Sequence, residues 1–211
     1  SKQCMKNNYK NKVFNPFIWL LAIAVNLVSW SNIKAQTCNT VLATQNFETG
    51  SSTMPSGWTS VLTSGTGAQW QNATASSYVY VGTSGAMTAK SGTQAAWFNG
   101  YAYNTGNNAA LVTPSFSLSA RTSSDSVTVS FWVYRHNAYT AYAGSPITVY
   151  VNTTNSLSGA TAISPAMPCF TASAPSVPSP GWYLMRFNIP ASFTGATNYV
   201  LINCASDYWN D

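Results

Sequence analysis

The sequence Val-Thr-Val-Ser-Phe-Trp-Val-Tyr, at residues 127–134, decides the fold class of this chain. Its odd-numbered residues are all apolar, and its even-numbered residues are two hydroxyl residues followed by two aromatic ones. Successive side chains of a β-strand point to opposite faces, so this period of two predicts a strand with one face against a core. The other face ends in Trp132 and Tyr134, which either lie covered or meet a ligand. We interpret residues 127–134 as a central strand of a β-sandwich.

Other short stretches of β-branched and aromatic residues follow one another along the chain, separated by Gly, Pro, Asn and Ser. No pattern outside the first 35 residues predicts a helix of three turns, and residues 71–77 and 164–180 are expected to be irregular. Many short strands with turns between them are typical of an antiparallel sandwich or barrel. The further strands predicted are 41–47, 95–98, 110–116, 147–151, 182–189 and 199–205.

The first 35 residues carry the three-part pattern of a secretory signal peptide. Lysines surround Met5, residues 17–25 are apolar without a break, and Ala35 precedes the expected cleavage. Polar residues interrupt the apolar stretch before it reaches the roughly 20 residues that a transmembrane helix needs. We therefore predict a secreted or cell-surface protein in which 1–35 is removed and 36–211 forms one domain.

The formal net charge of +5 belongs to the predicted leader, which contains five of the lysines. In residues 36–211, four cations and four carboxylates cancel. Nucleic acids and anionic membranes require clustered Lys and Arg, so we expect neither a nucleic-acid partner nor membrane insertion after cleavage. Charged residues make up only 6% of the chain, against about 25% in a typical domain. Ser, Thr, Asn and Gln must therefore cover the solvent-facing surface.

Three cysteines, Cys38, Cys169 and Cys204, remain beyond the leader. Export permits a disulfide. Three cysteines allow three different pairings, and the sequence does not choose among them. Any one pairing leaves one thiol over.

An ordered set of short motifs extends over residues 47–211. The motifs are Phe47-Glu48, Pro55-Ser56-Gly57-Trp58, Trp70, Gly-Thr-Gln-Ala-Ala-Trp-Phe at 92–98, Leu-Val-Thr-Pro at 111–114, Phe116-Ser117-Leu118, Val-Ser-Phe-Trp-Val-Tyr at 129–134, Gly181-Trp182 and Tyr-Val-Leu-Ile at 199–202. This set resembles the MAM-like jelly-roll modules called cleaved-adhesin or choice-of-anchor J domains, found in secreted Bacteroidota proteins. The resemblance implies a two-sheet antiparallel jelly roll used for adhesion or for binding extracellular glycans or proteins.

The resemblance also implies a structural Ca²⁺ near an acid of the first strand and near a closing strand rich in Asp. Glu48 matches the first of these positions. The sequence stops at Asn210-Asp211, where the closing strand is expected to begin. We therefore expect the domain to lack its last strand here, and the Ca²⁺ to belong to the full-length protein.

Aromatic side chains are the candidate ligand-binding residues, because their flat faces suit the CH faces of sugar rings. We expect three or four of the following tryptophans to be packed in the core: Trp58, Trp70, Trp97, Trp132 and Trp182. Aromatic residues in predicted loops are better placed to meet a ligand. The ligand-binding candidates are Tyr101, Tyr103, Tyr139, Tyr142 and Trp132.

Catalytic residues are scarce in residues 36–211. His136 is the only histidine, and a nucleophilic site would need it oriented by Asp125 or Asp207, with no Gly-x-Ser-x-Gly motif present. Glycoside hydrolysis needs two carboxylates at a fixed separation, and the domain has a single glutamate, Glu48. We predict a non-catalytic adhesion or carbohydrate/protein-binding module. The alternative is an accessory domain of an extracellular peptidase or glycosidase whose catalytic part lies outside this chain.

Overall fold

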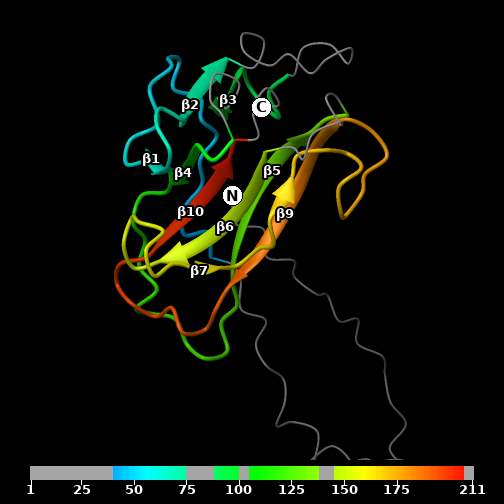
Figure 1. Ribbon diagram of the computed structural model, residues 1–211. Coiled ribbons are helices and arrows are strands. Elements are labelled where there is room, and N and C mark those ends of the chain that lie inside the picture. Colours follow the sequence, from blue (N-terminus) through cyan, green and yellow to red (C-terminus); the bar gives the residue numbers. More distant parts are fainter. Residues whose placement is uncertain (1–39, 75–87, 100–104, 138–144, 207–211) are drawn as a thin grey trace, which may run out of the picture. The chain divides into compact units, whose positions relative to one another are not determined.

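The computed structural model describes residues 40–74, 88–99, 105–137 and 145–206 (Figure 1). The chain divides into two units, Ser1–Val41 and Leu42–Asp211, and all the strands belong to the second. The predicted signal peptide, 1–35, lies outside the described residues. Over those residues every regular element is a β-strand, as predicted. They accordingly include no helix with the length and apolarity needed to cross a bilayer.

Six strands form the larger sheet, and every pair in it is antiparallel. Its central strand, β10, hydrogen-bonds to β4 on one side and β6 on the other, which explains why five consecutive residues of β10 are buried. In sheet order the strands are β1 (Thr59–Ser64), β4 (Asn108–Val112), β10 (Tyr199–Ala205), β6 (Pro146–Asn152) and β7 (Thr161–Ala162), with β8 (Met167–Pro168) also paired to β6.

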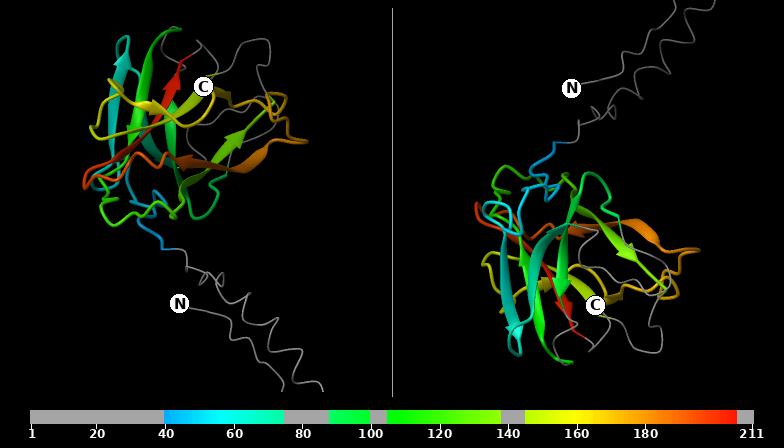
Figure 2. Two further views of the ribbon diagram at one scale, coloured as in Figure 1. Left: turned by 90° about the horizontal axis from the view of Figure 1, so that it is seen from below. Right: turned by 90° about the horizontal axis from the view of Figure 1, so that it is seen from above.

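Two antiparallel strand pairs complete the fold. The first joins β2 (Gln69–Thr74) to β3 (Gln94–Asn99), and the second joins β5 (Val127–Arg135) to β9 (Gly181–Ile189). β5 and β9 pair along all nine residues, and Figures 1 and 2 show them running side by side. Among the described strands, β9 is the only partner of β5. The prediction of a strand at 127–134 is confirmed, whereas the central position expected of it in the sandwich is not found among the described strands, where β5 has one partner.

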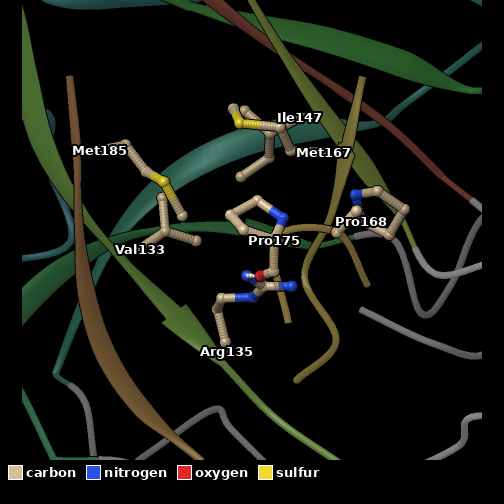
Figure 3. Close-up of a pocket in the computed structure, with 8 residues that line it drawn as sticks. Val133, Arg135, Ile147, Met167, Pro168, Pro175 and Met185 are labelled. Carbon is tan, nitrogen blue, oxygen red and sulfur yellow. Dashed lines mark hydrogen bonds between the residues drawn. The ribbon is translucent and has the colours of Figure 1, made fainter. Parts of the chain in front are cut away.

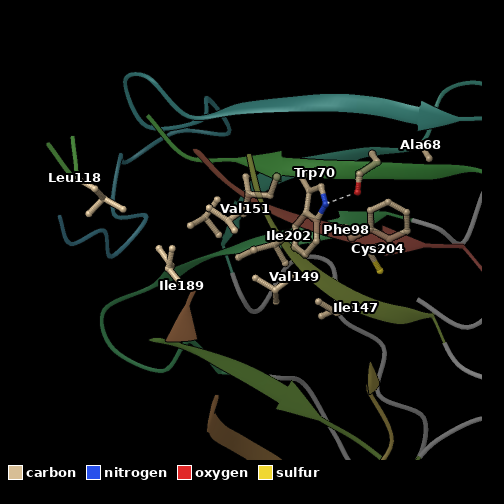
Figure 4. Close-up of a cluster of buried hydrophobic side chains, with 13 residues drawn as sticks. Ala68, Trp70, Phe98, Leu118, Ile147, Val149, Val151, Ile189, Ile202 and Cys204 are labelled. Carbon is tan, nitrogen blue, oxygen red and sulfur yellow. Dashed lines mark hydrogen bonds between the residues drawn. The ribbon is translucent and has the colours of Figure 1, made fainter. Parts of the chain in front are cut away.

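The main core lies between the larger sheet and these two pairs (Figure 4). Val149 and Ile202 point into it from the larger sheet, and Trp70 enters from β2. The odd-numbered apolar residues of β5, from Val127 to Val133, pack against the same cluster. The Trp70 indole N–H donates to the Ala109 carbonyl at 2.9 Å, so its polar atom is satisfied inside the core. Two layers of antiparallel strands around one core are consistent with a β-sandwich.

The structure has no strand at 41–47, where the sequence predicts the first one. The Gln45 side-chain oxygen accepts hydrogen bonds from the backbone N–H groups of Asn46 and Phe47, at 2.8 and 2.7 Å. Phe47 then adopts a φ of 63°. Amide side chains that bond to the local backbone compete with strand pairing, and the chain turns here instead of extending.

The predicted loop at 71–77 is also partly wrong, because β2 continues to Thr74. The polar side chain of Asn72 is buried and holds the turn at residues 49–53, as described below. A polar residue inside a strand resembles a loop when the sequence is read alone.

The predicted strand at 110–116 is shorter in the structure, because β4 ends at Val112, before Pro114. Phe116 makes only an isolated bridge to Asn198.

Candidate functional site

The face of β5 and β9 that points away from the core carries four cross-strand pairs of side chains. Exposure alternates along β5 with the expected period of two, and the even-numbered residues are the more exposed set. From the polar end to the aromatic end, the pairs are Thr128–Asn188, Ser130–Arg186, Trp132–Leu184 and Tyr134–Trp182. We call these eight residues the outer face.

The aromatic end of the outer face offers an accessible indole beside two braced rings. Trp132 is 45% exposed. The Tyr134 and Trp182 rings meet edge to face with centroids 5.5 Å apart. The Trp182 indole N–H donates to the Thr88 carbonyl at 2.8 Å, which fixes its orientation. The Lys90 ammonium lies 4.3 Å from the centre of the Trp132 ring.

The polar end of the outer face presents hydrogen-bonding groups to solvent. Thr128, Ser130, Arg186 and Asn188 are all exposed. The Thr128 hydroxyl donates to the Asn188 side-chain oxygen at 3.0 Å, which leaves the Asn188 amide N–H groups directed elsewhere. Arg186 lies directly across from Ser130 and one pair away from Trp132. An exposed ring beside amide, hydroxyl and guanidinium groups suits a ligand with both CH faces and polar substituents.

Of the predicted ligand-binding residues, the structure describes Trp132 and places it on the outer face. Tyr101, Tyr103, Tyr139 and Tyr142 lie outside the described residues. Trp70 is buried in the core. Trp58 packs against that core and meets Phe47 edge to face at 5.0 Å.

Sequence reasoning did not single out Lys90 or Arg186. Arg186 alternates with apolar residues in 182–189, so its outward direction could have been inferred. Its position beside Trp132 depends on the β5–β9 register, and the position of Lys90 depends on a contact between segments about forty residues apart. No local signal in the sequence predicts either one.

Glu48, the predicted Ca²⁺ ligand, is exposed and hydrogen-bonds to the start of β3. Its carboxylate accepts the backbone N–H of Gln94 at 2.7 Å, the backbone N–H of Thr93 at 2.8 Å and the Thr93 hydroxyl at 3.0 Å. These hydrogen bonds, that from Gln94 first, hold the pKa of Glu48 below its ordinary value, because they favour the charged form. Glu48 therefore ties the turn after Phe47 to β3.

A second group of oxygen atoms that could face a cation surrounds Asn72. The Asn72 amide nitrogen lies 2.6 Å from Thr49 Oγ1, 3.2 Å from the Ser51 carbonyl and 3.3 Å from the Thr53 carbonyl. Asn72 is 1% exposed, and its side-chain oxygen has no hydrogen-bond partner. With the amide turned over, four oxygens would converge, an arrangement that suits a hard cation. No cluster of three His, Cys, Asp or Glu residues occurs in the described part of the chain.

Asp125 and His136 do not form a catalytic pair. Asp125 precedes the first residue of β5 and His136 follows the last, so the length of the strand, roughly 30 Å, separates them. The Asp125 carboxylate accepts the backbone N–H and the hydroxyl of Thr122 at 2.7 and 2.9 Å. The His136 ring meets Phe170 edge to face at 5.0 Å. Asp207, the other acid considered, lies outside the described residues.

A small cavity at the end of β5 contains a buried cation (Figure 3). Arg135 is 2% exposed, and its guanidinium donates to the carbonyls of Phe170, of Ser173 at 2.6 Å and of Pro175 at 2.5 Å. Val133 and Met185 supply apolar lining. Three carbonyls of one loop on one guanidinium indicate that Arg135 anchors the proline-rich segment 164–180 to β5. That segment is almost entirely irregular, as predicted.

Two of the three cysteines beyond the predicted leader lie near one backbone oxygen. The thiols of Cys169 and Cys204 lie 3.8 and 3.9 Å from the carbonyl oxygen of Ser145. Cys204 belongs to β10, and Cys169 directly follows β8. Cys38 lies outside the described residues.

No family model, curated protein or solved structure matches this chain.

Proposed function

We propose that this chain is a non-catalytic binding module of a secreted or cell-surface protein, and that the outer face of β5 and β9 binds a saccharide. The observation that carries the proposal is the exposed Trp132 ring on one sheet face, with Arg186 one cross-strand pair away and Asn188 two pairs away along the same face. A pyranose ring stacks its CH face on an indole, while other hydroxyls of the saccharide bond to guanidinium and amide groups further along the same face.

The expected contribution of Trp132 follows from its exposed area. A tryptophan side chain buries 150–250 Å² when it is fully covered, so the exposed 45% corresponds to roughly 100 Å². At about 25 cal/mol per Å², covering that surface contributes up to about 2.5 kcal/mol. Loss of the ring should therefore weaken binding by up to roughly 60-fold.

The decisive experiment compares Trp132→Ala with Leu62→Ala on a glycan array and by titration calorimetry with the best saccharide found. Leu62 is a fair control because it is a large apolar side chain of nearly equal exposure, 47%, on a strand of the other sheet. We expect Leu62→Ala to bind as the unaltered chain does and Trp132→Ala to lose most of its affinity. Equal binding by the two variants, or no saccharide bound by the unaltered chain, would contradict the proposal.

A structural Ca²⁺ is the second part of the proposed function, and the oxygens around Asn72 support it. Thr49, Ser51, Thr53 and Asn72 would hold the ion, with the Asn72 side-chain oxygen turned toward the other three. Ca²⁺ takes six to eight oxygen ligands, so four neutral oxygens form only part of its shell. Bound there, the ion would brace the turn at 49–53 against β2. Glu48 supports the same turn without belonging to this set of oxygens, because it bonds to Thr93 and Gln94.

A further inference from the structure

We propose, resting on the saccharide-binding function above, that the ligand is an anionic saccharide bearing carboxylate or sulfate groups. Arg186 and Lys90 would hold its anionic groups beside the Trp132 ring. Both cations are exposed, Lys90 lies over the Trp132 ring, and Arg186 lies one cross-strand pair away from Trp132.

The distribution of charge over the described residues favours an anionic ligand. Glu48 and Asp125 are the described carboxylates, and both accept hydrogen bonds from backbone N–H groups, Glu48 from Thr93 and Gln94 and Asp125 from Thr122. Of the described cations, Arg121 and Arg135 are bound to backbone carbonyls. The remaining two, Lys90 and Arg186, are those beside Trp132. The outer face therefore carries positive charge that no described carboxylate balances, in a domain whose acids and bases are otherwise few.

The Lys90 ammonium occupies a position against the ring that a stacked sugar can take over. An ammonium over an indole face is held by the ring quadrupole, which is a weak contact at an exposed site. A sugar that covers the ring displaces this ammonium but leaves it at the edge of the bound ligand. At that edge the Lys90 ammonium loses its contact with the Trp132 ring and forms an ion pair with a carboxylate or sulfate of the ligand. Arg186, across from Ser130, offers the planar fork that binds such groups with two hydrogen bonds.

The test uses two matched pairs of polysaccharides: polygalacturonate with its methyl ester, and dextran sulfate with dextran. Titration at low and high NaCl should show tighter binding of the charged member of at least one pair, and the difference should shrink with salt. Arg186→Gln and Lys90→Gln should each reduce that preference by about two- to fivefold, the range of an exposed ion pair. Asn155→Asp is the matched control, since it lowers the net charge equally on an exposed loop after β6. It should leave the preference unchanged.

The outcomes separate this inference from the proposed function. If Trp132→Ala abolishes saccharide binding while charged and neutral members bind equally, the anion inference is wrong and the saccharide function stands. If Asn155→Asp reduces the preference as much as Arg186→Gln does, the net charge of the protein and not a contact with Arg186 causes the preference, and the inference is again wrong. If no saccharide binds, both proposals fall.

Discussion

The backbone of Gly92 lies so close to the carboxylate of Glu48 that a methyl group on Gly92 would approach its atoms to well under 3.0 Å. Gly92 also has a φ of +66°, a conformation that L-residues with side chains rarely adopt. Two independent reasons therefore require glycine at position 92: its positive φ, and the lack of space for a Cβ beside the Glu48 carboxylate. The contact ties the turn after Phe47 to the start of β3.

Gly92→Ala should destabilise the protein by more than backbone strain alone. Gly50 is a matched control, because its φ of +71° is similar but a Cβ there meets nothing within 4 Å. Gly50→Ala should cost about 1–2 kcal/mol of unfolding free energy from the left-handed conformation, and Gly92→Ala distinctly more. Glu48→Ala should bring the cost of Gly92→Ala down to that of Gly50→Ala. Chemical denaturation of the single and double variants measures this, and additive effects would contradict the contact.

The stability supplied by Glu48 should depend on pH in a defined direction. Its pKa is lowered in the folded state by the N–H groups of Gln94 and Thr93, whereas a glutamate in an unfolded chain titrates at about 4.3. The contribution is therefore fully present above the unfolded pKa and is lost as the pH falls through the lower folded pKa.

Glu48→Gln should accordingly melt below the unaltered protein at pH 7, and the gap should narrow as the pH falls below about 4.3. Hydrogen bonds from Thr122 lower the pKa of Asp125, so Asp125 also contributes stability that is lost as the pH falls. Asp125 is present in both proteins, so its effect cancels in the comparison. Melting curves from pH 7 to pH 2.5 provide the measurement. A gap that stays constant over this range would show that Glu48 acts through packing and not through its charge.

Asn72→Asp should make the stability of the protein strongly dependent on Ca²⁺. Without the ion, a buried carboxylate facing Thr49 Oγ1 and the carbonyls of Ser51 and Thr53 is repelled, so the variant should be less stable than the unaltered protein. With Ca²⁺ at about ten times its dissociation constant, binding should restore roughly 1.4 kcal/mol, or about 3–6 °C in Tm. Asn72→Ala removes the oxygen altogether and should not respond. Equal Ca²⁺ responses from the two variants would rule this site out.

Cys169 and Cys204 should form the disulfide if the protein is oxidised, because their sulfur atoms border the same Ser145 oxygen. In the chain-entropy account, closing the segment between them stabilises the protein by up to about 4 kcal/mol. Peptide mapping without reduction should find this pair after treatment with oxidised glutathione, which takes up the two electrons as the thiols lose their protons. Reduction should then lower Tm. Recovery of a Cys38 disulfide in the map would contradict the prediction.

The sequence alone determined the strands whose side chains alternate and the absence of helix from the described residues. At 127–134, 147–151 and 182–189 the apolar period of two lies within the strand itself, and 199–205 contains a short run of apolar β-forming residues, so neighbouring residues are enough to predict these strands. Prediction from neighbouring residues was wrong at 41–47, where the Gln45 side chain accepts backbone hydrogen bonds in place of a partner strand. It was also wrong at 71–74, where the buried Asn72 side chain hydrogen-bonds to the turn at 49–53.

Only the tertiary structure decided which residues meet. Nothing near Trp132 in the chain specifies that Arg186 lies one pair away or that Lys90 approaches its ring, since both depend on strand register and on segments more than forty residues distant. The contact of Glu48 with Gly92 and the contact of Asn72 with the turn at 49–53 are likewise not specified by neighbouring residues in the sequence. Strand periodicity is a property of adjacent residues, whereas strand partners are chosen by how the whole chain buries its apolar faces and pairs its backbone groups.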